Sequence, residues 1–141
     1  MSRTIAAAAC MAAMLWTGAA AAQSDGSATV EFEVLEPNLA VELAQKTRQD
    51  CLDRGYQVAV AVVDRFGVMQ AMVRSRFAGP HTVETARQKA YTAVSFRTDT
   101  LSLVEPTGAG SLQSGARQIP DVLMLGGGEP VRSAGSLIGA V

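Results

Sequence analysis

The sequence has few of the residues on which many catalytic and metal sites depend. It contains one histidine, His81, and two cysteines. One histidine cannot build a zinc site, because such a site needs three or four protein ligands. No Gly-x-Ser-x-Gly elbow, phosphate-binding P-loop or His-Glu-x-x-His motif is present. A Ser-His-Asp arrangement stays open, since its members need not be adjacent in sequence. These absences favour a binding protein over an enzyme.

The sequence also lacks an excess of positive charge and a long hydrophobic run. It has 12 basic and 13 acidic residues, whereas nucleic-acid-binding domains usually carry a basic surplus. The longest apolar stretch, residues 5–17, is shorter than the roughly 20 residues that span a membrane. We therefore expect no nucleic-acid partner and no integral membrane segment after processing.

The N-terminus predicts a secretory signal peptide over residues 1–22. Arg3 supplies a basic start, residues 5–17 form the apolar region, and Ala20 and Ala22 give a small-x-small cleavage site. The mature chain would then be periplasmic or secreted. It would have 119 residues (141 − 22), which suits one domain.

Cys51 is the only cysteine left after this cleavage, so no disulfide can form within the mature chain. It falls on the same helical stripe as Ala40, Ala44 and Thr47. A small buried hydrophobic side chain is the expected role, and a disulfide between two chains is the alternative.

The pattern of apolar residues predicts an alternation of helices and strands. Residues 23–37 form a leader with a short edge strand, because Val30, Phe32 and Val34 alternate with glutamates. Asn38 caps a first helix that closes at Gly55. The remaining expectations are a central strand over 57–63, a turn over 64–67, a strand over 68–74, a helix from Pro80 to about 96, a long loop over 98–119 with one short helical turn, and strands near 122–125, 131–132 and 136–141.

The second predicted helix has two different faces. Its core stripe consists of Val83, Ala86, Ala90, Ala93 and Val94. The opposite face carries His81, Thr85, Lys89, Thr92 and Phe96. Haem brings its own equatorial ligands, so one axial ligand and an apolar slot are enough to bind it. His81 is therefore a candidate axial ligand of haem iron.

Other side chains could also ligate haem iron or bind the haem propionates. Four residues at positions where packing is the default role could ligate iron: Met69, Met72, Tyr91 and Met124. Four basic residues could pair with haem propionates or with a substrate carboxylate: Arg74, Arg76, Arg87 and Lys89. Of these, Lys89 and Arg87 are the candidates for propionate contact.

Two stretches carry a resemblance to a known family. They are YQVAVAVVDRFGVMQAMVRSRFAGPHTVETARQKAYTA and GGGEPVRSAGSLIGAV. The chain resembles, over residues 38–141, the haem-binding and haem-degrading family that includes GlcG and HbpS. The residues most specific to this resemblance are Val62-Val63-Asp64 with Gly67, the helix from Thr85 to Ala93, and residues 138–141.

This resemblance implies an α+β, profilin-like domain with an antiparallel sheet flanked by helices. It also implies a homo-oligomer that binds haem at or near a subunit interface. Together with the helical pattern, it makes His81, Thr85, Lys89, Arg87 and Phe96 the candidate haem-binding residues. The function implied is haem storage, transfer or sensing, and haem degradation is open. The family pattern continues beyond Val141, so we expect the domain to be incomplete at its C-terminus and less stable for that reason.

Two alternatives remain from the residues alone. One is a sensor or enzyme for a small organic acid, whose carboxylate Lys89 and an arginine would hold. The other is an accessory interaction module without a cofactor.

Overall fold

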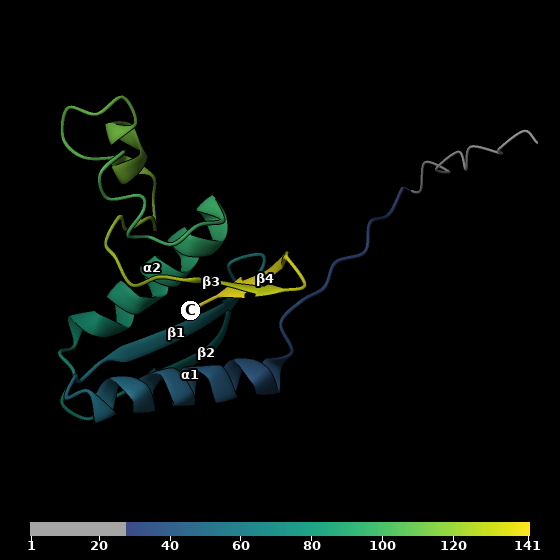
Figure 1. Cartoon of the computed structure of the whole chain (residues 1–141), viewed down its shortest axis with the longest axis vertical. Coiled ribbons are helices and arrows are strands. Elements are labelled where there is room, and N and C mark those ends of the chain that lie inside the picture. Colours follow the sequence, from purple (N-terminus) through teal and green to yellow (C-terminus); the bar gives the residue numbers. More distant parts are fainter. Residues whose placement is uncertain (1–27) are drawn as a thin grey trace, which may run out of the picture. The chain divides into compact units, whose positions relative to one another are not determined.

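Residues 28–141 are described by a computed structural model (Figure 1). The predicted signal peptide, residues 1–22, and residues 23–27 of the leader lie outside the described residues. Residues 28–31 belong to an N-terminal unit, and Phe32–Val141 form a second, compact unit. Its elements are α1 (Pro37–Asp53), β1 (Ala59–Asp64), β2 (Met69–Arg74), α2 (His81–Phe96), a short 3₁₀ helix (Ser114–Gln118), β3 (Pro130–Ser133) and β4 (Ser136–Ala140).

The four strands form one antiparallel sheet in the order β2-β1-β4-β3. Helix α1 packs on one face of the sheet and helix α2 on the other (Figure 1). The predicted α+β fold, an antiparallel sheet flanked by helices, is confirmed. Among residues 28–141, no helix has both the length and the apolar character needed to cross a membrane.

Strand β1 is buried on both faces because its alternate side chains are all apolar. Val60 and Val62 pack with Ala40 and Ala44 of α1 in one core cluster. Ala61 and Val63 face the other way and pack with Ala90, Ala93 and Val94 of α2. Side chains alternate between the two faces of a strand, so a run without polar residues can be covered on both sides. The central strand predicted over residues 57–63 is confirmed.

The turn between β1 and β2 is built around the buried carboxylate of Asp64. Its Oδ1 accepts hydrogen bonds from the backbone N–H groups of Phe66 at 2.8 Å and Val68 at 3.1 Å. Its Oδ2 accepts one from Gln70 Nε2 at 3.0 Å. Gly67 has a φ of 81°, a conformation that favours glycine. Asp64 and Gly67, two of the most specific residues of the family resemblance, therefore build the turn between β1 and β2.

Helix α1 begins one residue earlier than its predicted cap. Pro37 is the first helical residue, and the Glu36 side chain accepts a hydrogen bond from Leu39 N at 2.9 Å. Proline has no N–H to satisfy and suits the first helical position, so the residue before it becomes the cap. The prediction that Asn38 caps the helix was wrong.

The edge strand predicted around Val30, Phe32 and Val34 is absent from the described residues. Residues 29–36 are assigned no strand, and these three side chains are 75%, 51% and 48% exposed. The segment bonds to the sheet at one point, where Leu35 N donates to Ile138 O at 3.2 Å. The Phe32 ring lies under the guanidinium of Arg65, with 4.0 Å between Cζ and the ring centroid.

Helix α2 is covered on a side that the periodicity did not reveal. Thr92, which was assigned to the face opposite the core, is fully buried, whereas Val83 of the predicted core stripe is 37% exposed. The reason is the segment that follows α2 and returns across it. Thr92 Oγ1 accepts a hydrogen bond from Leu123 N at 2.8 Å and donates one to Gln88 O at 2.7 Å. Residues 122–125 form this cover and not the predicted strand.

The two edges of β1 are paired to different extents. Strand β2 pairs with β1 from Ala59 to Val63. On the other side, β4 pairs only with Val63 and Asp64. Within residues 28–141, the part of β1 before Val63 is flanked by a strand on one side only.

We predict that Asp64→Ala destabilises the domain by about 2–3 kcal/mol, because a buried carboxylate that accepts three hydrogen bonds is lost. Urea unfolding followed by circular dichroism measures the change. Asp53→Ala is the control, since Asp53 accepts one exposed hydrogen bond from Gln49, and its effect should stay within about 0.5 kcal/mol. Equal midpoints for the two variants would contradict the role given to Asp64.

Candidate functional site

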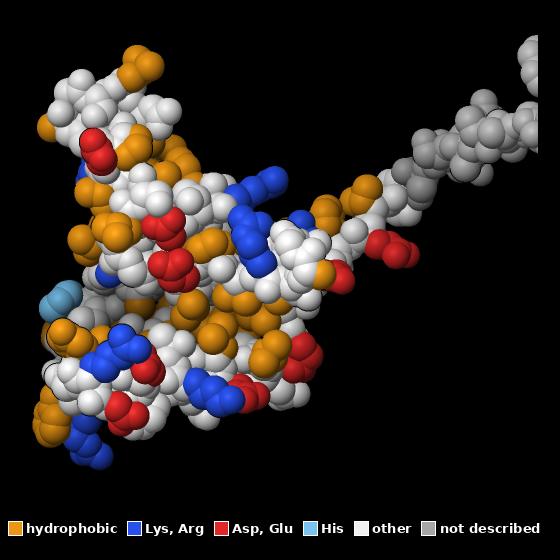
Figure 2. Space-filling view, viewed as in Figure 1, with side chains coloured by type: hydrophobic (Ala, Val, Ile, Leu, Met, Phe, Trp, Pro, Cys, Tyr) orange, Lys and Arg blue, Asp and Glu red, His pale blue; other side chains and the backbone are white. Residues whose placement is uncertain are grey.

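A hollow of about 370 Å³ opens beside the incompletely paired edge of β1. We call it the β1 slot. It lies between the α1 and α2 layers, where Figure 2 shows hydrophobic side chains gathered. Its lining consists of Thr47 and Cys51 from α1, residues 57–61, four residues of α2 (Thr82, Thr85, Ala86 and Lys89), and Gly127, Glu129 and Val141.

The α2 wall of the slot follows from helical spacing. Thr82, Thr85, Ala86 and Lys89 are separated by three, one and three residues, which places them on one face of a helix. The threonine hydroxyls donate to backbone carbonyls, Thr82 to Gly79 O at 2.6 Å and Thr85 to His81 O at 3.0 Å. Because both hydroxyls are bonded to the helix backbone, this wall of the slot is less polar than two threonines would suggest.

Lys89 is the cationic group of the slot. Its side chain is half-buried, and burial lowers the pKa of its amine. No hydrogen bond or ion pair to this amine occurs within residues 28–141. A Cβ placed on Gly127 would lie 3.3 Å from Lys89 Nζ, and one on Gly128 would lie 2.5 Å from Lys89 O. The glycines therefore let this loop approach Lys89 closely and leave its amine facing the slot.

The structure brings two of the five predicted site residues, Thr85 and Lys89, into the slot. His81 is exposed at the first position of α2, and its ring lies beside Gly79, where a Cβ would come within 2.7 Å of Cε1. Phe96 is 36% exposed at the last position of the same helix. Neither His81 nor Phe96 lines the slot.

Arg87 is held outside the slot by two carboxylates. Its Nη2 lies 2.6 Å from Glu84 Oε1 and 2.5 Å from Asp121 Oδ1. These hydrogen bonds raise the pKa of the guanidinium. Arg87 thereby ties α2 to the segment that covers it, and a propionate would have to compete with both carboxylates.

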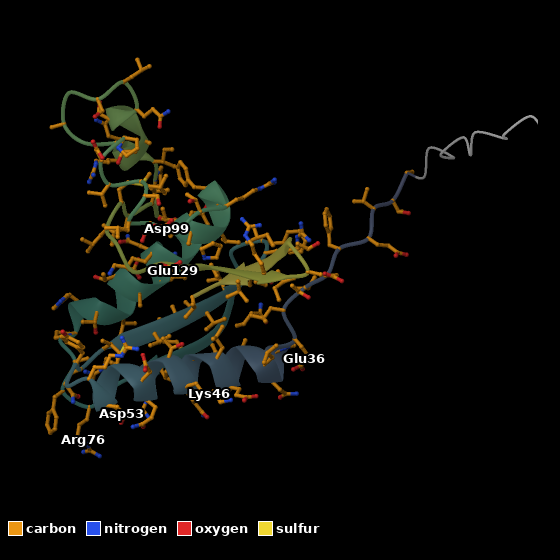
Figure 3. The ribbon with its side chains drawn as sticks, viewed as in Figure 1. Glu36, Lys46, Asp53, Arg76, Asp99 and Glu129 are labelled. Carbon is orange, nitrogen blue, oxygen red and sulfur yellow. The ribbon has the colours of Figure 1, made fainter. Side chains whose placement is uncertain are left out.

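Most of the weaker candidates have packing roles. Met124 is buried, Met72 packs partly buried against the α2 side of the sheet, and the Tyr91 ring lies against Gly67. Arg74 donates to the carbonyl of Ala78. Figure 3 shows Arg76 projecting from the body of the domain.

Sequence reasoning missed two residues of the slot, Cys51 and Glu129. Cys51 does lie on the predicted stripe, but its thiol is half-buried and lines the slot with Thr47. The spacing of four residues between Thr47 and Cys51 was the available signal. Across residues 28–141, no cluster of three or more His, Cys, Asp or Glu could hold a metal ion.

Comparison with known proteins identifies the family. The family model described as haem degrading protein HbpS-like matches residues 35–141. A double mutant of HbpS from Streptomyces reticuli is 30% identical, with a TM-score of 0.74 over 96% of this chain and 83% of that one. The chain therefore belongs to the HbpS-like family. No curated protein matches it.

Two other solved structures have the same fold. The Klebsiella pneumoniae protein ORFY is 22% identical, with a TM-score of 0.77 over 80% of this chain and 79% of that one. The protein PduOC, in a complex with haem, is 26% identical, with a TM-score of 0.70 over 77% and 80% of the two chains.

We predict that Lys89→Met raises the melting temperature at pH 7 and that the gain shrinks as the pH approaches about 10.5, the ordinary pKa of lysine. Burial lowers the pKa of Lys89 in the folded state, so at neutral pH the folded protein carries a charged, partly desolvated amine. The free-energy cost of burying the charged amine disappears as the pH rises from the pKa of Lys89 in the folded protein to its higher pKa in the unfolded chain. Thermal melts at several pH values measure the difference.

Lys46→Met is the control for this experiment, since Lys46 is exposed and pairs with Glu42 at 2.6 Å. It should give no gain at pH 7. A gain for Lys89→Met that is the same at every pH would instead indicate better packing by methionine.

Proposed function

We propose that this chain is an exported haem-binding protein, used for haem storage, transfer or sensing, and that the β1 slot receives the tetrapyrrole. Membership of the HbpS-like family supports haem as the ligand, as does the relative that forms a haem complex. The periplasmic or secreted location is part of the proposal and rests on the signal peptide predicted over residues 1–22.

The observation that carries this proposal is the half-buried amine of Lys89, which has no partner within residues 28–141 and lies in a largely apolar slot whose lining also includes Glu129. Haem combines an apolar macrocycle with two propionate carboxylates. The residues present fit that combination: the β1 and α2 walls offer apolar contacts, and Lys89 offers a cation. A carboxylate beside Lys89 would stabilise the charged amine that burial disfavours.

Because His81 lies outside the slot, it could ligate the haem iron only if the centre of the macrocycle projected from the slot. His81 is exposed and lies one helical turn before Thr85. At about 370 Å³ the slot is near the lower end of ligand pockets, which are roughly 300–1,000 Å³. A projecting haem edge would be covered by a second subunit, which is why binding at a subunit interface in a homo-oligomer is part of the proposal.

The roles within the site then differ from residue to residue. Lys89 would hold a propionate, Thr85 and Ala86 would contact the macrocycle, and His81 would be the ligand of the iron. Arg87 positions the segment that carries Asp121 and thereby the cover of α2. When bound, haem supplies the iron centre that storage, transfer or sensing requires.

A small organic acid is the second candidate ligand, and Lys89 favours it too. This alternative also needs an arginine to hold the carboxylate, and no arginine lines the β1 slot. An accessory module without a cofactor is the third candidate. Both are outcomes of the experiment below.

The test is a haemin titration of residues 23–141, followed through the Soret band, with wild type, His81→Ala, Lys89→Met and Lys46→Met. Wild type should bind saturably. His81→Ala should shift the Soret band, because the axial ligand changes, and Lys89→Met should weaken binding by about threefold to tenfold without moving the band. Lys46→Met, which removes an exposed lysine of α1, should behave as wild type.

Each result separates one part of the proposal from the others. An unchanged Soret band for His81→Ala would place the axial ligand elsewhere. If Lys89→Met and Lys46→Met bound haemin with equal affinity, haem would not bind in the β1 slot. No saturable binding by wild type would overturn haem as the ligand, and calorimetry with glycolate would then decide between the organic-acid sensor and the accessory module.

A further inference from the structure

A second hollow, of about 390 Å³, lies at the end of α2 that is remote from the β1 slot. We call it the arginine hollow. Its lining includes three arginines, Arg65, Arg97 and Arg132, and two apolar side chains, Val94 and Leu137. None of these residues lines the β1 slot. Figure 2 shows Lys and Arg side chains gathered over the end of α2 and the β3–β4 hairpin.

The three guanidinium groups have no carboxylate partner in the part of the chain that the structure describes. Among residues 28–141 none of them makes an ion pair, and no acidic residue lines the hollow. Glu33 contacts Arg65 through its backbone carbonyl, which lies 3.3 Å from Arg65 Nη1. Three positive charges around one hollow create a potential that attracts an anion.

Two of the three guanidinium groups are held in place. Arg132 Nη2 donates to Arg97 O at 2.8 Å, and Arg132 Nη1 donates to Gly135 O at 3.3 Å. Arg65 is held by its backbone contact and by the Phe32 ring, whose centroid lies 4.0 Å from Cζ. A guanidinium has five N–H donors, so both arginines keep donors for a ligand. Arg132 also occupies the carbonyl just after α2, and the carbonyl end of a helix would otherwise disfavour an anion.

Arg97 has a backbone conformation that a helix end usually gives to glycine. Its φ is 59° and its ψ is 28°, which is the left-handed region. Its side chain makes no hydrogen bond or ion pair among residues 28–141, so no polar contact compensates for this conformation there. A strained residue whose side chain has no polar role in the fold is a candidate for function.

The lining of the arginine hollow favours a phosphate group that is attached to a small organic body. Phosphate carries up to two negative charges and several acceptor oxygens, and arginine binds it with paired N–H donors. Val94 is buried and Leu137 packs partly buried against the α2 core, so both offer apolar contacts. A volume of about 390 Å³ lies within the range of small-molecule sites. A phosphate ester uses both kinds of contact, whereas free phosphate uses only the arginines.

We propose that the arginine hollow binds a small organic phosphate ester. Arg65, Arg97 and Arg132 surround the phosphate, and the organic part lies against Val94 and Leu137. This site is separate from the β1 slot and does not rest on haem binding. It gives the protein a second ligand of a different chemical class.

Calorimetric titration of the protein with glycerol 3-phosphate, in a low-salt buffer without phosphate, tests the site. Wild type should bind the ester saturably and more tightly than inorganic phosphate, and sodium chloride at the same ionic strength should not bind. Arg97→Gln should weaken binding by at least about fivefold, because a charged hydrogen-bonding group is lost. Arg76→Gln is the matched control. It removes the same charge from an arginine that projects from the domain (Figure 3), so its affinity should stay within about twofold of wild type.

Arg97→Gly separates a binding role from a structural one. Glycine suits the φ of 59°, so this variant should have a higher melting temperature than wild type. It should also lose as much affinity for glycerol 3-phosphate as Arg97→Gln does. A lower melting temperature would show that the fold itself needs the arginine side chain, and it would contradict the binding role.

Three further results would overturn the phosphate-ester site. They are the absence of saturable binding by wild type, equal affinities of Arg97→Gln and Arg76→Gln, and inorganic phosphate that binds as tightly as the ester. Haemin titration of Arg97→Gln should match that of wild type, because the arginine hollow and the β1 slot share no residue. Failure of this site and failure of the haem proposal are therefore distinguishable.

Discussion

The structure depends on the burial of β1 between two helices. Val60 and Val62 form one core with α1, and Ala61 and Val63 form the other with α2. A strand in this position brings its backbone into a low-dielectric interior, where peptide groups need partners. Strand β2 supplies them on one side, whereas β4 supplies them only at Val63 and Asp64.

Much of the fold could be predicted because the signals are local. The alternation over residues 57–63, the turn residues Asp64 and Gly67 and the proline before α2 each specify structure within a few positions. The errors came from contacts that are distant in sequence. Thr92 is buried because Leu123 returns to it, and residues 30–34 alternate like a strand but are not paired with the sheet.

The candidate site divides in the same way. Thr85 and Lys89 could be assigned to one face from helical spacing, and both line the slot. Arg87 shares that part of the helix, but Asp121, 34 positions later, holds its guanidinium elsewhere. The slot itself is set by strand pairing and by the glycines that let residues 126–128 approach Lys89. Periodicity predicts which side chains share a face, and only the tertiary fold decides what that face meets.

The most direct test of this account is amide hydrogen exchange of β1, measured by NMR on dilute protein without haem. The account predicts alternation along the strand: the amides of Val60 and Val62, which point towards β2, exchange slowly, and the amide of Ala61, which points into the slot, exchanges much faster. An Ala61 amide as protected as that of Val62 would contradict the open slot on which the proposed haem site depends.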